Sequence, residues 1–93
     1  MNRPQLQDVA PAYQVLPALT AEYAQDSAQT EMKFYQFITY HESVQQHASA
    51  NLYRCALVQL RSGLGAGHLG IMYPRPGESY VDADKRLREE AGI

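Results

Sequence analysis

The 93-residue chain has no tryptophan, a single cysteine and no long apolar run, and each absence narrows what the protein can be. The lone Cys55 cannot form an internal disulfide, whereas small secreted domains usually carry several. A membrane span needs about 18 consecutive apolar residues, which the chain lacks, and its first residues lack the apolar stretch of a secretory signal. We therefore expect a cytoplasmic protein that does not enter a membrane.

The chain also lacks an excess of charge of one sign, because eight lysines and arginines nearly balance ten acidic residues and the formal net charge is -2. The densest positive cluster is 85–88, and Asp84 and Glu89 on either side of it cancel its field. A general nucleic-acid binder needs a basic surface for the phosphates, so we expect no such activity. Hydrophobic residues make up 45% of the chain, which is typical of one small globular domain over residues 1–93.

Glycine and proline are both missing from residues 18–62, and this long stretch without helix breakers favours helix. Within it an apolar stripe repeats at alternating spacings of three and four, which places its members on one face of a helix. The members are Phe34, Phe37, His41, Val44, Ala48, Asn51, Cys55 and Val58. The pattern predicts a central amphipathic helix over 31–61, and Gly63 follows where a glycine cap belongs.

One unbroken helix of that length would be about 46 Å long, whereas a domain of this size is about 32 Å across. The helix is therefore expected either to break or to pair with a second chain. The sequence offers a break at Ser43–Gln46, a capping box in which Ser43 would bond the backbone of Gln46. A second interpretation is an α+β fold, because residues 33–40 are rich in strand formers and 69–73 could form a short strand.

The two ends of the chain differ in character. Three prolines within residues 1–17 disfavour helix in the residues before them, so we expect an extended arm there. Residues 63–79 hold most of the glycines and are expected to form a glycine-rich loop. Ser79 then opens a second capping box, followed by oppositely charged residues four positions apart. We therefore predict a mainly α fold that closes with a charged helix. The narrow apolar face of that helix is Val81, Leu87 and Ala91.

No group of residues makes a convincing catalytic or metal site. Gly65–Gly70 matches the G-x-G-x-x-G spacing of dinucleotide-binding loops, but Pro74 follows too soon for the helix that such a loop needs. His41 and His47 are six residues apart and diverge around a helix, so they do not form a metal-binding pair. Cys55 lies on the apolar stripe, where an inert buried thiol is usual. We expect no catalysis, no metal and no cofactor.

Tyrosine is the abundant aromatic residue, with seven copies against two phenylalanines. Tyrosine and arginine are enriched where proteins bind proteins, because they bury a large area of contact. The predicted protein-binding residues lie off the central stripe: Tyr35, Tyr40, Tyr53 and Arg54. The face expected to form a homodimer is Phe34, Phe37, His41 and Val44.

These patterns favour a binding function over an enzymatic one. The first hypothesis is a small non-catalytic protein-interaction module, a regulator or inhibitor that acts by binding another protein. The second is a small-ligand or nucleotide-binding module that uses the Gly63–Gly70 loop.

Overall fold

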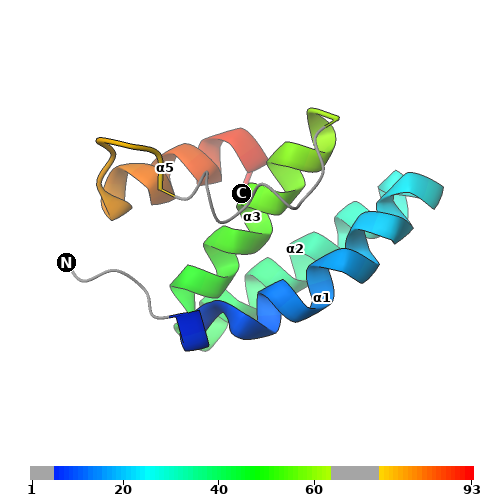
Figure 1. Cartoon of the computed structure of the whole chain (residues 1–93), viewed down its shortest axis with the longest axis horizontal. Helices are drawn as coiled ribbons and strands as arrows, with labels where there is room; N and C mark the ends of the chain where they lie inside the picture. Colours follow the sequence, from blue (N-terminus) through cyan, green and yellow to red (C-terminus); the bar gives the residue numbers. More distant parts are fainter. Residues whose placement is uncertain (1–5, 64–73) are drawn as a thin grey trace.

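Helix is the only regular secondary structure within residues 6–63 and 74–93, the part of the chain described by this computed structural model. The helices are α1 (Leu6–Gln25), α2 (Ser27–Ser43), α3 (His47–Arg61) and α5 (Tyr80–Ala91). They form a compact bundle, so the predicted mainly α fold is confirmed (Figure 1). None of the described helices is long and apolar enough to span a membrane.

Helix α3 is the centre of the bundle, because α1, α2 and α5 all pack against it, and α1 also packs against α2 (Figure 1). Ten of its 15 residues are buried, so it has almost no free surface. The surrounding helices complete the core with Leu16, Leu19, Phe34, Ile38 and Leu87. Each surrounding helix therefore has an inward face on the core and an outward face toward solvent.

The predicted break in the central helix is confirmed, because residues 44–46 separate α2 from α3. Gln45 has a positive φ of 64°, which turns the chain, and the Gln46 amide donates to the His41 carbonyl at 2.8 Å. The predicted capping box is wrong in its detail. Ser43 ends α2 and its hydroxyl donates to the Tyr40 carbonyl at 2.6 Å, while the N-cap of α3 is Gln46.

The strand alternative for residues 33–40 is wrong, because all of them lie in α2. Phe34 and Ile38, four residues apart, are both buried against the core. A strand would instead have placed Phe34, Gln36 and Ile38 on a common face. Burial of one helical face therefore outweighs the strand preference of the individual residues. The other expected strand, over 69–73, lies outside the described residues.

Helix α1 begins at Leu6, within the segment 1–17 for which an extended arm was expected. Leu16 and Leu19 are buried in the core, and this burial offsets the local preference against helix. Pro17 lies on the exposed side of α1. Because proline has no amide hydrogen, the backbone carbonyl four residues before it lacks its helical partner, and water can bond to that carbonyl instead. Residues 1–5 lie outside the described part of the chain.

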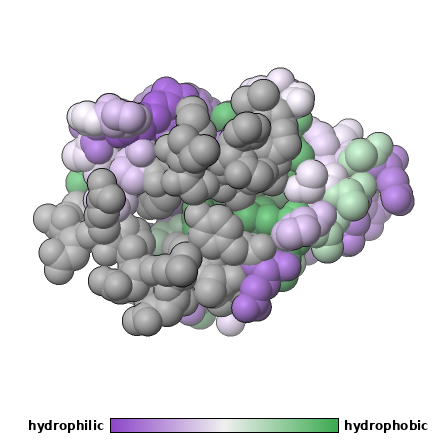
Figure 2. All heavy atoms as spheres, viewed as in Figure 1, coloured by the Kyte–Doolittle hydropathy of each residue, from purple (hydrophilic) through white to green (hydrophobic). Residues whose placement is uncertain are grey.

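Helix α5 is the charged C-terminal helix that the sequence predicts. The Ser79 hydroxyl accepts the Asp82 amide at 3.1 Å, and Gly92 ends the helix with a φ of 78°. Its buried residues are Ala83, Leu87 and Ala91, so Ala83 takes the inward place expected for Val81, which is exposed. Hydrophilic residues gather over α5 in Figure 2. Gly63 has the left-handed φ of 81° expected after α3, and the rest of the glycine-rich loop to residue 73 lies outside the description.

Candidate functional site

Helix α2 is held at its first turn by Asp26. The Asp26 carboxylate accepts the Gln29 amide at 3.1 Å, and the Thr30 hydroxyl donates to the Asp26 carbonyl at 2.8 Å. From there the inward face of α2 follows a helical period and is buried. Its members are Thr30, Phe34, Ile38 and His41. This inward face fixes which side of α2 is left toward solvent.

The charged residues of α2 all form ion pairs with neighbouring helices. The Lys33 ammonium lies 2.7 Å from the Glu22 carboxylate of α1, and Glu31 lies 2.7 Å from the Arg61 guanidinium of α3. At the other end of the helix, Glu42 pairs with guanidinium groups of α3 and α5. These contacts draw each charge of α2 to an edge of the helix.

Hydrogen bonds from arginines keep the carboxylates of Glu31 and Glu42 ionised. The Arg61 guanidinium hydrogen-bonds Glu31 and lowers the pKa of that carboxyl, against a smaller opposing effect of burial. Burial raises the pKa of Glu42, but hydrogen bonds from Arg54 and Arg88 outweigh it and hold the pKa below its ordinary value. Both acids of α2 are therefore negative at neutral pH and matched by arginines.

The outward face of α2 is left without charge. The exposed residues of the helix are Ser27, Ala28, Gln29, Met32, Gln36, Thr39, Tyr40 and Ser43. Five exposed positions spaced four apart wind round the outer side of α2 and its C-cap, and we call them the α2 stripe: Ala28, Met32, Gln36, Tyr40 and Val44. Each step of four residues turns about 40° round the helix, so Met32, Gln36 and Tyr40 form the centre of the stripe.

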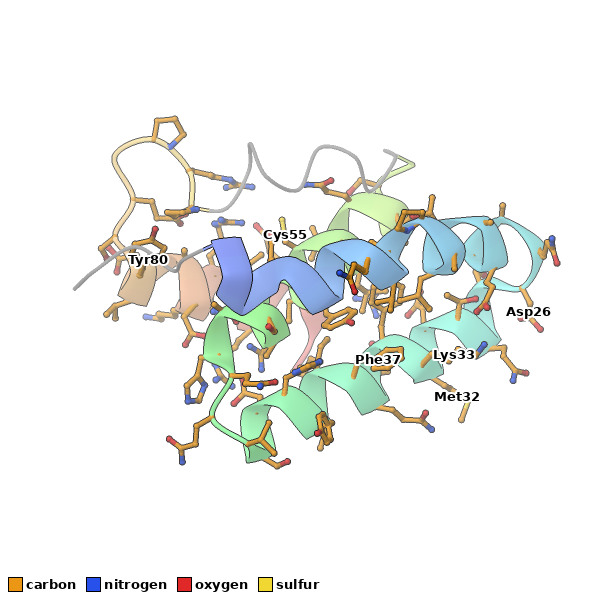
Figure 3. All side chains as sticks on the ribbon, turned by 60° about the horizontal axis from the view of Figure 1, so that its bottom comes forward. Asp26, Met32, Lys33, Phe37, Cys55 and Tyr80 are labelled. Carbon is orange, nitrogen blue, oxygen red and sulfur yellow. The ribbon has the colours of Figure 1, made fainter. Side chains whose placement is uncertain are left out.

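Large apolar side chains on the α2 stripe are open to solvent. Met32 is 62% exposed, Tyr40 59% and Val44 44%. Figure 3 shows Met32 pointing away from the bundle. Single exposed apolar residues are common, but a row of them without a charge among them has the composition of an interface centre, which is depleted in charge and enriched in tyrosine and methionine.

An open groove of about 510 Å³ adjoins the stripe between α1 and α2. It is lined by Val15, Gln36, Phe37, Tyr40, His41 and Tyr53. The Tyr53 ring stacks on Phe37 at 5.1 Å between centroids and on His41 at 5.4 Å. The His41 Nδ1 donates to the Gln46 amide oxygen at 2.6 Å, which fixes the ring. These contacts make the groove wall a rigid aromatic surface.

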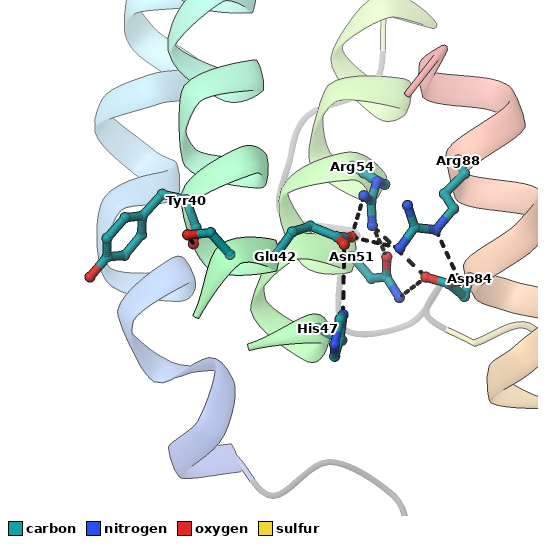
Figure 4. Close-up of polar contacts among 8 residues, drawn as sticks. Tyr40, Glu42, His47, Asn51, Arg54, Asp84 and Arg88 are labelled. Carbon is teal, nitrogen blue, oxygen red and sulfur yellow. Dashed lines mark hydrogen bonds and ion pairs between the residues drawn. The ribbon is translucent and has the colours of Figure 1, made fainter. Parts of the chain in front are cut away.

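A partly buried polar cluster joins α2, α3 and α5 (Figure 4). The Arg54 guanidinium donates to Asn51 and to Glu42, and Arg88 donates to the same Glu42 oxygen at 2.7 Å. Asp84 accepts from Asn51 and from Arg88, at 3.0 Å in each case. The cluster ties α5 to the rest of the bundle, so its arginines act in packing.

The four predicted protein-binding residues do not form one surface. Tyr40 is exposed on the α2 stripe, but Tyr53 and Arg54 are only 2% and 1% exposed. Tyr35 is half-buried, and its hydroxyl accepts a hydrogen bond from the Arg61 guanidinium of α3. The structure therefore leaves Tyr40 as the one member of this set that projects freely into solvent.

The four predicted self-association residues are also divided. Phe34 is fully buried in the core, while Phe37 and His41 form part of the groove wall. Val44 lies on the exposed α2 stripe. The sequence reasoning missed Ala28, Met32 and Gln36, although their four-residue spacing without charge could have revealed them.

The candidate catalytic and ligand-binding residues are less favourably placed. Burial raises the pKa of the Cys55 thiol to about 11, so it is protonated at neutral pH and a poor nucleophile. Among the residues that the structure describes, no group of three or more histidine, cysteine or acidic side chains could hold a metal. Of the proposed Gly63–Gly70 ligand loop, only Gly63 is described.

Comparison of the chain with protein-family models, with curated proteins and with solved structures gives no match.

Proposed function

We propose that this chain is a small non-catalytic protein-interaction module, a regulator or inhibitor that acts by binding another protein through the outward face of α2. The single observation that carries the proposal is the charge-free row of exposed side chains on the α2 stripe. Desolvating a charged residue is costly, whereas this face can be covered without that cost. Tyr40 and Met32 supply large contact areas at its centre.

The adjoining groove supports the same function. Phe37, His41 and Tyr53 hold each other by stacking, so the wall beside Tyr40 is rigid before a partner arrives. A preorganised surface loses little conformational freedom on binding, which favours affinity. An apolar side chain of a partner could enter this groove while the backbone of the partner lies on the stripe.

A photo-crosslinking amino acid placed at Gln36 tests the proposal in cells that produce the chain. The matched control carries the same amino acid at Lys85, which is also exposed, on α5. We expect a discrete protein adduct from position 36 that is absent from position 85. A further Tyr40→Lys substitution should abolish the adduct, because it places a charge at the centre of the contact.

Two results would contradict the proposal. One is the same set of adducts from positions 36 and 85, which would indicate collisions without a preferred surface. The other is an adduct at position 36 that persists in full in the Tyr40→Lys variant. Circular dichroism of each variant shows whether it keeps the helical fold, and both positions are exposed, so we expect it to do so.

A further inference from the structure

Helix α5 is attached to the molecule differently from the other three described helices. Helices α1, α2 and α3 each pack against both of the other two, whereas α5 packs against α3 alone. It reaches α2 through a side-chain contact, the hydrogen bond from Arg88 to Glu42. Figure 1 shows α5 lying on one flank of α3. The described helices therefore form a three-helix unit with a fourth helix laid on one of its members.

The three-helix unit has an apolar core of its own. All the buried members of the described core except Leu87 come from α1, α2 and α3. They include Phe34 and Tyr53, whose rings meet edge to face with centroids 6.2 Å apart. The other buried residues of α5 are Ala83 and Ala91, which bury little apolar area. Departure of α5 would remove one large side chain from the core and leave the others in contact.

The remaining contacts of α5 with the three-helix unit are polar. Arg88 donates to Glu42 of α2 at 2.7 Å, and Asp84 accepts from Asn51 of α3 at 3.0 Å. The side chains of Arg88 and Asp84 are 39% and 36% exposed, so water can replace their partners at little cost. These contacts orient α5, but they stabilise it less than apolar burial stabilises α2.

We propose that α5 is a detachable cover of α3, which opens as one unit while α1, α2 and α3 stay packed. Opening separates Asp84 from Asn51 and Arg54 of α3, and it brings these two side chains into contact with water. Arg54 is only 1% exposed in the closed state. The open state therefore presents a face of α3 that the closed state hides. This device is separate from the outward face of α2, on which the proposed function rests.

Thiol labelling at two buried alanines tests the proposal. Ala83 of α5 and Ala50 of α3 are both 0% exposed, and Ala50 belongs to the apolar core. Each is replaced by cysteine in a Cys55→Ala chain, so that the introduced thiol is the only one. Each labelling rate is divided by that of the same variant in urea. We expect Ala83→Cys to react at least about tenfold faster than Ala50→Cys, because opening of α5 alone is enough to expose it.

Removal of one positive charge from α5 tests how the cover is held. Arg88→Gln should raise the labelling rate at position 83 about tenfold, the effect of losing a hydrogen bond to a charged group, and leave position 50 unchanged. Lys85→Gln, at an exposed position of the same helix, is the matched control and should change neither rate. An increase from about 0.1 M to about 1 M salt shortens the screening length from about 10 Å to about 3 Å, so it should speed labelling at position 83 alone.

Hydrogen exchange of the wild-type chain keeps the proposal testable if a cysteine variant fails to fold. An isolated helix as short as α5 is marginal in water, so its amides exchange whenever it leaves α3. We expect the slowest amides of α5, around Leu87, to share one protection factor. It should lie well below that of the slowest amides of α3, around Leu57, and respond little to low concentrations of urea.

Three results would overturn the proposal. Equal labelling of positions 83 and 50 would mean that α5 leaves only when the whole chain unfolds. Equal protection of α5 and α3 in hydrogen exchange would mean the same. An effect of Arg88→Gln that is as large at position 50 as at position 83 would show that Arg88 stabilises the whole fold rather than the cover. None of these results bears on crosslinking from position 36, so the proposed function is tested separately.

Discussion

Helices α2 and α5 pack against the same central helix but present opposite surfaces to solvent. The exposed residues of α2 carry no charge, whereas those of α5 include Asp82, Lys85, Glu89 and Glu90. On α2, every charged side chain is drawn into an ion pair with another helix. On α5, charges of both signs remain on the outward face, which is the usual composition of a solvated helix.

The inward faces of α2 and α5 differ in how much apolar side chain they bury. Helix α2 inserts large apolar side chains, Phe34 and Ile38, into the core. Helix α5 buries one leucine and two alanines, and gains further contact through Asp84 and Arg88 in the polar cluster. Helix α2 is therefore fixed by burial of large apolar side chains and has a charge-free outward surface. Helix α5 is fixed by a small apolar face together with ion pairs and has a charged outward surface.

The largest difference in stability is expected between substitutions on the buried and the exposed side of α2. Phe34→Ala should lower the free energy of unfolding by about 3–5 kcal/mol, because it removes a fully buried ring and leaves a cavity. Met32→Ala, two residues earlier, should lower it by less than about 0.5 kcal/mol, because Met32 lies on the exposed side. Urea unfolding followed by circular dichroism measures both. Similar losses in the two variants would show that α2 has no free face.

The next effect tests how α5 is fixed. Glu42→Gln should lower the free energy of unfolding by about 1–3 kcal/mol, because Arg54 and Arg88 lose their common charged acceptor. The control is Glu89→Gln on the outward face of α5, expected to change stability by less than about 0.5 kcal/mol. A Glu42→Gln variant as stable as the wild type would mean that apolar contacts alone hold α5.

A smaller loss of folding stability is expected at low pH. Glu78 lies just before the N-cap of α5. Hydrogen bonds from Arg86 lower the pKa of this carboxyl from its ordinary value of 4.5 to about 2. A lowered folded-state pKa gives stability that is present above the unfolded value and is lost as pH falls. Stability should therefore decline between about pH 4.5 and about pH 2, by about 1 kcal/mol for this group after solvent screening.

Urea titrations at several pH values measure this dependence. In Glu78→Gln, the share of the decline that comes from this carboxyl should disappear, while the part due to Glu42 and Asp84 should persist, since their pKa values are also lowered. An identical pH profile in wild type and Glu78→Gln would show that the Arg86 contact does not stabilise the fold.

The smallest change in stability is expected from a substitution that changes the charge of the outward face of α2. Gln36→Lys gives α2 a charged outward face like that of α5, and should alter the free energy of unfolding by less than about 0.5 kcal/mol. The same substitution should reduce the protein adduct formed from a photo-crosslinking amino acid at Met32, because a partner would then have to cover an unpaired charge. Thermal unfolding measures the stability, and crosslinking in cells measures the binding. A variant that loses stability but keeps its adduct would reverse this assignment.

Local features of the fold could be predicted from the sequence because they depend on neighbouring residues. The caps at Ser79 and Gly92, the glycine after α3 and the break before His47 all belong to this kind. The helical state of residues 33–40 depended on burial against α3 instead. Tertiary contacts outweighed local preference there.

The candidate site was predictable only in part, for a related reason. Tyr53 and Arg54 lie off the apolar stripe and would be exposed on a helix with one buried face, but α3 is covered by three other helices. Arg54 finds its acceptor in Glu42, twelve residues away, which no local pattern indicates. The α2 stripe could not be predicted from apolar periodicity, because its central member Gln36 is polar.

The central claim is that the charge-free face of α2 is the contact surface of this protein. Amide chemical shifts of the isotope-labelled chain, recorded by NMR with and without the protein that crosslinks to position 36, test it most directly. We expect partner-dependent shifts at Met32, Gln36 and Tyr40, and none at Lys85 or Glu89 of α5. Shifts centred on α5 while α2 stays unchanged would contradict the claim.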